Sequence, residues 1–180
     1  MHQDFADCSA LAGVLSRQDA AVFCLGAYTG AVSGAELRRV TVDYAIEFAC
    51  VFHNSSPAAA LSFLSATGAD PTGRSRAPFA RYKGEAEKAL LAMGFSGVYI
   101  FRPAYIYPVL PRKEPNFGYR LLRTIYPLFR RLFPNQVIRS DELARAMVDV
   151  AVVGTPEGHG PVLENRDIRA LASQRSSARG

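Results

Sequence analysis

Short apolar runs alternate with longer mixed stretches through the first hundred residues of this 180-residue chain. Continuous apolar runs at residues 20–25, 60–65 and 98–101 predict buried strands, because each is short and is bounded by polar residues, Gly or Pro. Apolar runs of this kind are typical of strands that are covered on both faces, as in a parallel sheet.

The segments between these runs predict helices. Residues 35–52 carry apolar side chains at helical spacing, and residues 80–93 form an Ala-rich stretch that ends at Gly94. Alternating strands and helices predict right-handed crossovers and a doubly wound parallel sheet with helices on both faces. In such sheets, ligands bind at the loops that follow the carboxyl ends of the strands.

The C-terminal third has a different pattern. Residues 117–133 mix arginines with large apolar side chains around Pro127, which predicts two short helices or a single kinked helix. A further helix is expected over residues 141–154. Ser140 is its predicted N-cap, and acidic residues occupy its first turn.

One domain accounts for most of the chain. A last strand is expected at residues 162–165, and a short helical turn after it. With 49% apolar and 21% charged residues, the chain has the composition of an ordinary globular domain. We therefore interpret residues 1–171 as a single partial domain and residues 172–180 as a disordered polar tail.

The positive charge is concentrated in one segment. The net charge is +5, and residues 112–139 hold seven basic residues and one acid, which leaves the remainder at −1. We interpret this segment as a helical lid over a substrate, with its arginines in solvent. Membrane-surface binding is the less favoured alternative, because Pro127 interrupts any long amphipathic helix. No nucleic-acid-binding motif is present, so nucleic acid is not an expected partner.

The cysteines and histidines favour a reducing compartment. Cys8, Cys24 and Cys50 are odd in number and lack metal-finger spacing, and the three histidines lie far apart, so no metal site or disulfide framework is expected. The N-terminus is acidic where a signal peptide is basic, and no apolar run reaches the length of a membrane span. The expected location is the cytoplasm.

Four separate blocks resemble one enzyme superfamily in order, spacing and residue identity. They are VFCLGAYTGAVSGAELRRVTVDYAIEFA, LSFLSATGAD, YKGEAEKALLAMGFSGVYIFRPAYIYP and VLENRDIRAL. Together they resemble the atypical short-chain dehydrogenases/reductases, in particular the branch of the Tat-interacting-protein oxidoreductases. The resemblance implies a Rossmann-like fold that binds NAD or NADP and acts on a small carbonyl or hydroxyl substrate.

The resemblance also implies a set of site residues. The residues expected beside the cofactor are Cys24, Leu25, Gly26, Lys83, Arg102, Pro103 and Ala104. Lys83 is expected to hold the ribose, and Ser65 or Thr67 is expected to contact the carbonyl of the substrate. Either hydroxyl can instead form a hydrogen bond with the backbone at the end of the strand or in the following turn, and the sequence does not decide between these interpretations.

The catalytic pattern of the superfamily is Tyr-x-x-x-Lys, and this chain departs from it. Residues four apart on a helix lie one above the other, so the residue that faces Lys83 is Phe79, which has no proton to donate. Tyr82 lies roughly 100° around the helix from Lys83 and is interpreted as an ordinary flank residue. Tyr105 or Tyr107 is an alternative proton donor.

A second departure concerns the phosphate-binding turn. No GxGxxG turn begins the chain, and Gly26, Gly30 and Gly34 have the wrong spacing for one. The resemblance implies that roughly 50 to 60 residues of the fold are missing, at about 30 residues per strand-helix unit. The doubly wound sheet is therefore expected to be incomplete. Its strand at residues 20–25 then becomes an exposed apolar edge that favours self-association.

Two functions remain open from the sequence. The first is an NAD(P)-dependent oxidoreductase that is impaired by Phe79 and by the missing turn. The second is a non-catalytic Rossmann-like protein that binds a partner or, weakly, a nucleotide.

Overall fold

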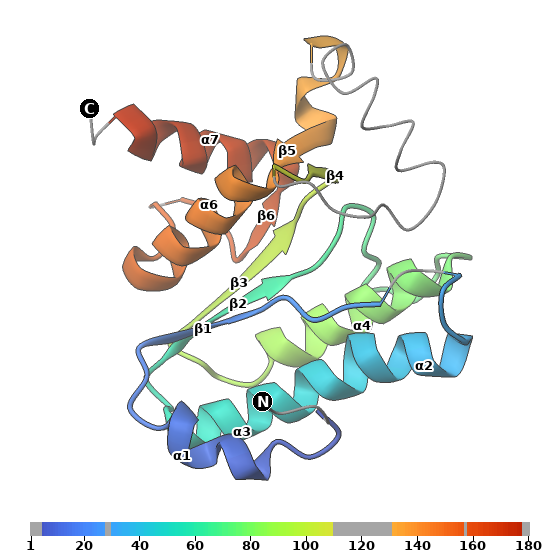
Figure 1. The fold of residues 1–180 in the computed structure, drawn as a ribbon, viewed down its shortest axis with the longest axis vertical. Coiled ribbons are helices and arrows are strands. Elements are labelled where there is room, and N and C mark those ends of the chain that lie inside the picture. The colour runs from blue at the N-terminus through green and yellow to red at the C-terminus, as the bar shows by residue number, and fades with distance from the viewer. Residues whose placement is uncertain (1–4, 28–29, 110–130, 157, 178–180) are drawn as a thin grey trace.

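The predicted parallel sheet is present. The computed structural model describes residues 5–27, 30–109, 131–156 and 158–177. Four parallel strands form its main sheet in the order β1-β2-β3-β6 (Figure 1). They are β1 (Ala20–Phe23), β2 (Ala60–Leu64), β3 (Gly97–Arg102) and β6 (Val162–Glu164). The apolar runs therefore do form strands, and β2 and β3 occupy the centre of this sheet.

Helices cover both faces of the sheet, as the alternation of elements predicts (Figure 1). On one face lie η1 (Ser9–Leu11), α1 (Ala12–Leu15), α2 (Gly34–Arg38), α3 (Tyr44–Ser55) and α4 (Pro78–Leu91). A π-helical stretch, Arg39–Asp43, joins α2 to α3. On the other face lie α6 (Ser140–Val153) and α7 (Asn165–Ser177). The described residues thus form a four-stranded parallel sheet between two helix layers, the architecture of a doubly wound fold of the Rossmann type.

Each face of the sheet has its own apolar core. The core below α3 and α4 is rich in aromatic rings, and Phe52 and Phe63 are fully buried in it. The core below α6 and α7 contains Phe101, Met147 and Ile168. Strands with apolar side chains on both faces are stable only between two such layers, which is why the runs are continuously apolar.

Element boundaries differ slightly from the predictions. The predicted helix 35–52 runs over residues 34–55 once the π-helical stretch is included. The helix predicted at 80–93 is α4, which starts earlier because a proline occupies its first turn. Ser140 is not the N-cap of α6 but its first helical residue, and its hydroxyl accepts a hydrogen bond from the backbone N–H of Val109 at 3.2 Å.

Two short strands and the length of the last helix were not predicted. β4 (Tyr105–Tyr107) and β5 (Val137–Arg139) pair in parallel as a separate two-stranded sheet, with η3 (Pro134–Gln136) just before β5. Helix α7 continues to Ser177 and so includes most of the segment that we expected to be a disordered tail. Most of the expected lid, residues 112–139, lies outside the described residues.

Candidate functional site

The predicted site residues gather at one edge of the sheet. Cys24 follows β1, Ser65 follows β2 and Arg102 ends β3. The register is parallel throughout, so the carboxyl ends of these strands lie side by side. The ladder continues past the strands, because the backbone N–H of Ser65 donates to the carbonyl of Phe101 at 2.8 Å.

Lys83 projects from α4 toward the end of β2. Its side chain is buried, and its Nζ donates to the backbone carbonyl of Leu64 at 2.7 Å. The ammonium lies over the ring of Phe63, 4.7 Å from its centroid. Burial lowers the pKa of Lys83 to about 8, while the charges of Glu87 and Cys24 act in the opposite direction. At neutral pH the amine is therefore mostly protonated.

Phe79 occupies the position that the superfamily pattern gives to tyrosine. Its ring centroid lies 6.0 Å from the Nζ of Lys83, one helical turn away. Tyr82 is half-buried on an adjoining flank of α4. Tyr105 and Tyr107 lie in β4, which has left the main sheet and pairs with β5. The group that faces the lysine from the preceding turn is thus a hydrocarbon ring.

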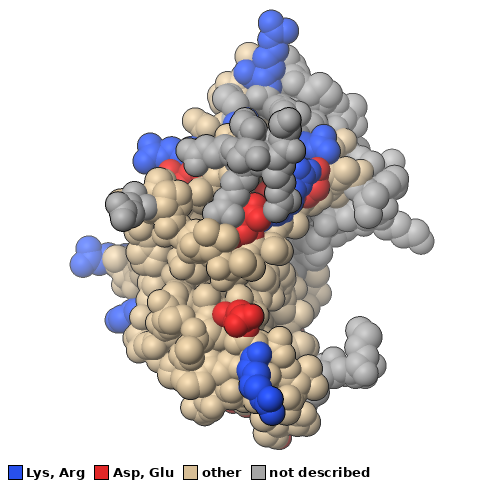
Figure 2. All heavy atoms as spheres, turned by 90° about the vertical axis from the view of Figure 1, so that its left-hand side faces the viewer, with Lys and Arg blue, Asp and Glu red and all other residues tan. Residues whose placement is uncertain are grey.

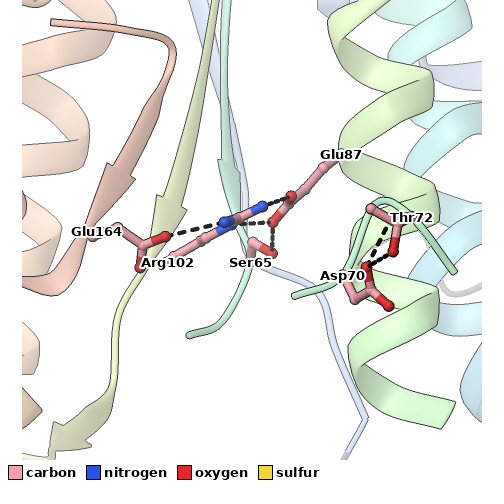
Figure 3. A network of polar contacts seen from close by, with 6 residues as sticks. All are labelled: Ser65, Asp70, Thr72, Glu87, Arg102 and Glu164. Atoms are coloured by element: carbon pink, nitrogen blue, oxygen red, sulfur yellow. Dashed lines mark hydrogen bonds and ion pairs between the residues drawn. The ribbon is translucent and has the colours of Figure 1, made fainter. Parts of the chain in front are cut away.

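A buried ionic network lies next to Lys83 (Figure 3). Glu87 is 1% exposed and accepts hydrogen bonds from the hydroxyl of Ser65 and from Arg102, whose Nε and Nη2 donate to its two oxygens at 3.0 and 2.5 Å. The Nη1 of Arg102 donates to Glu164 at 3.0 Å. The carboxylate of Glu87 is the main reason why the pKa of Arg102 is raised further above its usual value.

This network changes the interpretation of Ser65 and Arg102. The hydroxyl of Ser65 is directed to a buried carboxylate, and the guanidinium of Arg102 is shared between two carboxylates. Sequence reasoning missed Glu87, although an acid four residues after Lys83 lies on the same helix face. That spacing was the signal that could have identified it.

The other predicted residues line the same edge. Thr67 is exposed, and its backbone N–H donates to the carbonyl of Pro103 at 3.0 Å. The backbone N–H of Ala104 donates to the side chain of Asn165 at 3.0 Å. Asn165 is 3% exposed and also donates to the backbone carbonyls of Asn135 and Val137, so it connects β3, β5 and β6. Of the two candidate hydroxyl residues, only Thr67 is exposed to solvent.

The first loop of the site is open. Leu25 is half-buried, and a Cβ built on Gly26 would have no atom within 4 Å, so there is space beside this glycine. The residue Cys24 is exposed, yet neighbouring atoms withdraw its thiol from water far enough to raise its pKa, against the effect of Lys83. The thiol is therefore neutral at pH 7.

A cavity of about 330 Å³ opens beside the ionic network, between α4 and the strands β3 and β6. It is lined by Pro71, Glu87, Lys88, Leu91, Ala92, Arg102 and Val162. Its walls are therefore mainly apolar, and the buried Glu87–Arg102 pair contributes to them. Lys83 is not among the lining residues, so this cavity is separate from the space at Gly26.

Charged side chains are sparse on the side of the molecule that shows the ends of α6 and α1 (Figure 2). This side therefore presents no continuous basic surface. In the part of the chain that the structure describes, no three His, Cys, Asp or Glu side chains cluster as metal ligands would. Among those same residues, no helix combines the length and the apolar character needed to cross a bilayer.

Comparison with known proteins identifies the fold. Neither family models nor curated proteins match the sequence. The structure of the Bordetella bronchiseptica enzyme WbmG in complex with NAD aligns with 99% of this chain, at 16% sequence identity and a TM-score of 0.58. UDP-N-acetylglucosamine 4-epimerase from Bacillus cereus aligns with 94% of the chain, at 14% identity and a TM-score of 0.60.

A third similar structure is a short-chain dehydrogenase/reductase superfamily protein from Agrobacterium tumefaciens with bound NAD. It aligns with 97% of this chain at 13% identity and a TM-score of 0.62. The present chain spans 63% of the length of WbmG and 69% of the other two. At these identities the similarity establishes the fold and not the activity. The chain has the Rossmann-like fold of the short-chain dehydrogenase/reductase and epimerase structures.

Proposed function

We propose that this chain is an NAD(P)-dependent oxidoreductase-like protein of the atypical short-chain dehydrogenase/reductase type, with weakened carbonyl chemistry. The observation that carries the proposal is the ring of Phe79, 6.0 Å from the Nζ of Lys83. Lys83, which we expect to be the lysine of the catalytic pattern, lies on α4, and the residue that faces it has no proton to donate. Two of the similar structures contain NAD, which supports a nicotinamide dinucleotide as ligand.

The residues at the sheet edge fit the nicotinamide-ribose half of such a cofactor. The space beside Gly26 allows a ligand to approach the backbone closely, and Lys83 supplies a buried cation nearby. The described residues include no Gly-rich turn of the kind that holds a pyrophosphate, so binding is expected to be weak. When bound, the nicotinamide would donate or accept a hydride.

The residues of this chain have separate tasks in the proposed reaction. Lys83 would donate to a ribose hydroxyl with one of its remaining N–H groups, while its bond to the carbonyl of Leu64 holds the side chain in position. Thr67 is the better of the two hydroxyls for contact with a substrate carbonyl, because Ser65 already donates to Glu87. Phe79 leaves the developing alkoxide without a proton donor, which slows reduction.

A second candidate function is binding without turnover, of a partner protein or a nucleotide. It is favoured by the internal contacts of the expected ligand-binding groups. Lys83 donates to a backbone carbonyl, and Arg102 forms ion pairs with Glu87 and Glu164. The guanidinium of Arg102 is available to a cofactor only after its ion pairs break, and the ammonium of Lys83 has already committed one of its three donors.

Replacing Phe79 by Tyr tests the proposal. We expect Phe79→Tyr to raise the reductase rate with NADH or NADPH and small carbonyl compounds by about tenfold or more, because a positioned general acid contributes roughly 10²–10⁴-fold. The rate is measured from the absorbance of the reduced nicotinamide. Tyr82→Phe is the matched control and should leave the rate unchanged, since Tyr82 lies on another flank of the helix.

Calorimetric titration with NADH and NADPH separates the two functions. Binding at millimolar cofactor is the expected result for the oxidoreductase. If neither nucleotide binds the folded wild-type chain, the oxidoreductase proposal is wrong and partner binding without a cofactor is left. If a nucleotide binds and Phe79→Tyr produces no gain in rate, weak nucleotide binding without turnover is favoured.

A further inference from the structure

Lys83 carries its amine into the fold without a directly bonded counter-charge. The residue is 5% exposed, and its Nζ donates to the neutral backbone carbonyl of Leu64 at 2.7 Å. Among the residues that the structure describes, no carboxylate lies within ion-pair distance of this nitrogen. A lysine that is withdrawn from water and lacks an ion pair loses part of its preference for the charged form.

The acid one helical turn from Lys83 is bonded to another cation. Glu87 follows Lys83 by four residues, on the same face of α4. Both of its oxygens accept hydrogen bonds from Arg102, and the hydroxyl of Ser65 donates to one of them (Figure 3). The carboxylate attracts the lysine only through space, because its hydrogen bonds are made with Arg102 and Ser65.

Two phenyl rings lie beside the amine. The centroid of Phe63 is 4.7 Å from Nζ, and that of Phe79 is 6.0 Å away. Phe79 occupies the preceding turn of α4, where a polar side chain could have solvated the charge. The rings attract an ammonium group much more weakly than a carboxylate does, and they exclude water. A desolvated amine in an apolar site is the form in which lysine acts as a nucleophile.

The proton on Lys83 is held weakly as a result. Burial lowers the pKa of Lys83 to about 8, against the charges of Glu87 on α4 and of Cys24 after β1, while Arg102 of β3 is bonded to Glu87. About half of the amine is then neutral at pH 8, compared with about 0.4% for a lysine with the ordinary pKa near 10.4. Cys24 is exposed, so the amine that it influences lies close to the surface and within reach of small molecules.

We propose that Lys83 is a nucleophile that forms an imine with small apolar aldehydes. The neutral Nζ attacks the carbonyl carbon, and a proton passes from the nitrogen to the oxygen, which gives a carbinolamine. The C–O bond then breaks, the oxygen leaves as water, and a C=N bond to Nζ remains. One amine and one aldehyde thus give one imine and one water, without an oxidant or a reductant. The rings of Phe63 and Phe79 favour an aldehyde with an apolar substituent.

The missing proton donor at Phe79 is compatible with this chemistry. A phenyl ring cannot protonate a carbonyl oxygen, whereas a protonated imine activates the same carbon without a separate general acid. No nucleotide takes part in imine formation, so the activity goes beyond the proposed oxidoreductase function. A chain that binds no NADH can still form the imine, and a chain that binds NADH can fail to form it, so the two proposals are tested separately.

Trapping with butanal and cyanoborohydride, without nucleotide, tests the proposal. Cyanoborohydride reduces the imine to a stable secondary amine, and mass spectrometry of peptides compares Lys83 with Lys88, an exposed lysine on the same helix. At pH 8 we expect Lys83 to be labelled about tenfold faster than Lys88. The ratio should fall between pH 8 and pH 10, as ordinary lysines lose their protons, and should be near one in urea-unfolded chain. A ratio near one in the folded chain at pH 8 overturns the proposal.

A carboxylate placed beside the amine tests the geometry. Phe79→Glu puts an acid one helical turn from Lys83, so it should favour the ammonium and slow the labelling of Lys83 at pH 8 at least threefold. Tyr82→Glu is the matched control and should change the rate less than twofold, since Tyr82 lies on another flank of the helix. Circular dichroism establishes that each variant is folded. Undiminished labelling in folded Phe79→Glu overturns the proposal.

The choice of aldehyde tests the expected substrate class. The preference for Lys83 over Lys88 should be larger with butanal than with glycolaldehyde, because the propyl chain of butanal packs against phenyl rings and the hydroxymethyl group of glycolaldehyde does not. An equal preference with both aldehydes overturns the assignment of apolar aldehydes.

Discussion

At the scale of single residues, Lys83 is the buried cation of the candidate site. Its pKa is about 8 in the folded chain, mainly because burial disfavours the ammonium, whereas a lysine in an unfolded chain has a pKa near 10.5. Between these two values the unfolded state binds more protons than the folded state. The free energy of unfolding therefore rises as the pH increases from about 8 to about 10.5.

Lys83→Met should remove this contribution. The wild type should gain about 3 kcal/mol relative to Lys83→Met between pH 7 and pH 10.5, since the pKa shift corresponds to this free energy. Urea unfolding of both proteins at several pH values measures the difference. The comparison cancels the titration of tyrosines and cysteines that both chains share. A constant difference over this range would show that the lysine is not desolvated.

Glu87 is the second residue whose environment leads to a prediction about stability. It is buried with both oxygens bonded to Arg102, whereas the side chain of Glu164 is 45% exposed. Glu87→Ala should destabilise the fold by about 3–5 kcal/mol, because it leaves the guanidinium of Arg102, whose side chain is only 16% exposed, without its main partner. Glu164→Ala should cost less than about 1 kcal/mol. Equal losses in chemical denaturation would contradict the assigned burial.

At the scale of elements, Gly84 sets the contact between α4 and the preceding loop. A Cβ at this position would lie 2.0 Å from the carbonyl carbon of Asp70 and 2.3 Å from the nitrogen of Pro71, both of them backbone atoms. The loop is held in place by the carboxylate of Asp70, which accepts hydrogen bonds from Thr72 and Ser75. These bonds lower the pKa of Asp70 to about 2.

Gly84→Ala should therefore destabilise the protein by about 3 kcal/mol or more, because the helix and the loop must separate. The control is Gly13→Ala in α1, where a Cβ meets no atom within 4 Å. This change should be neutral or stabilise the fold by up to about 1 kcal/mol, as for other glycines in helices. Thermal unfolding of the two variants measures both effects. Tolerance of alanine at residue 84 would mean that the loop lies further from α4.

At the scale of the whole molecule, the two central strands are enclosed on all sides. β2 and β3 have a strand on each side and a helix layer on each face, while β1 and β6 are edges of the described sheet. We expect the slowest amide hydrogen exchange in β2 and β3, and faster exchange in β1 and β6 at low protein concentration. Exchange followed by mass spectrometry measures this order, and equal protection of β1 and β3 in a dilute sample would contradict it.

Sequence patterns alone were sufficient to predict the strands of the main sheet and the helices between them. Continuous apolar runs identified its strands, and helical spacing placed Phe79 opposite Lys83, a relation that the structure confirms at 6.0 Å. These features are local, because they depend on residues within one run or one helical turn. The boundary errors at α4 and α6 arose where Pro78 and Ser140 took helical positions inside the first turn.

By itself, then, the sequence determined the alternating strands and helices, the parallel sheet and the absence of an acid opposite Lys83. Only the tertiary structure decided that Ser65 and Arg102 meet at Glu87, and that Tyr105–Tyr107 pairs with Val137–Arg139. The physical reason is distance along the chain: these partners lie 15 to 32 residues apart, and no local periodicity encodes such contacts.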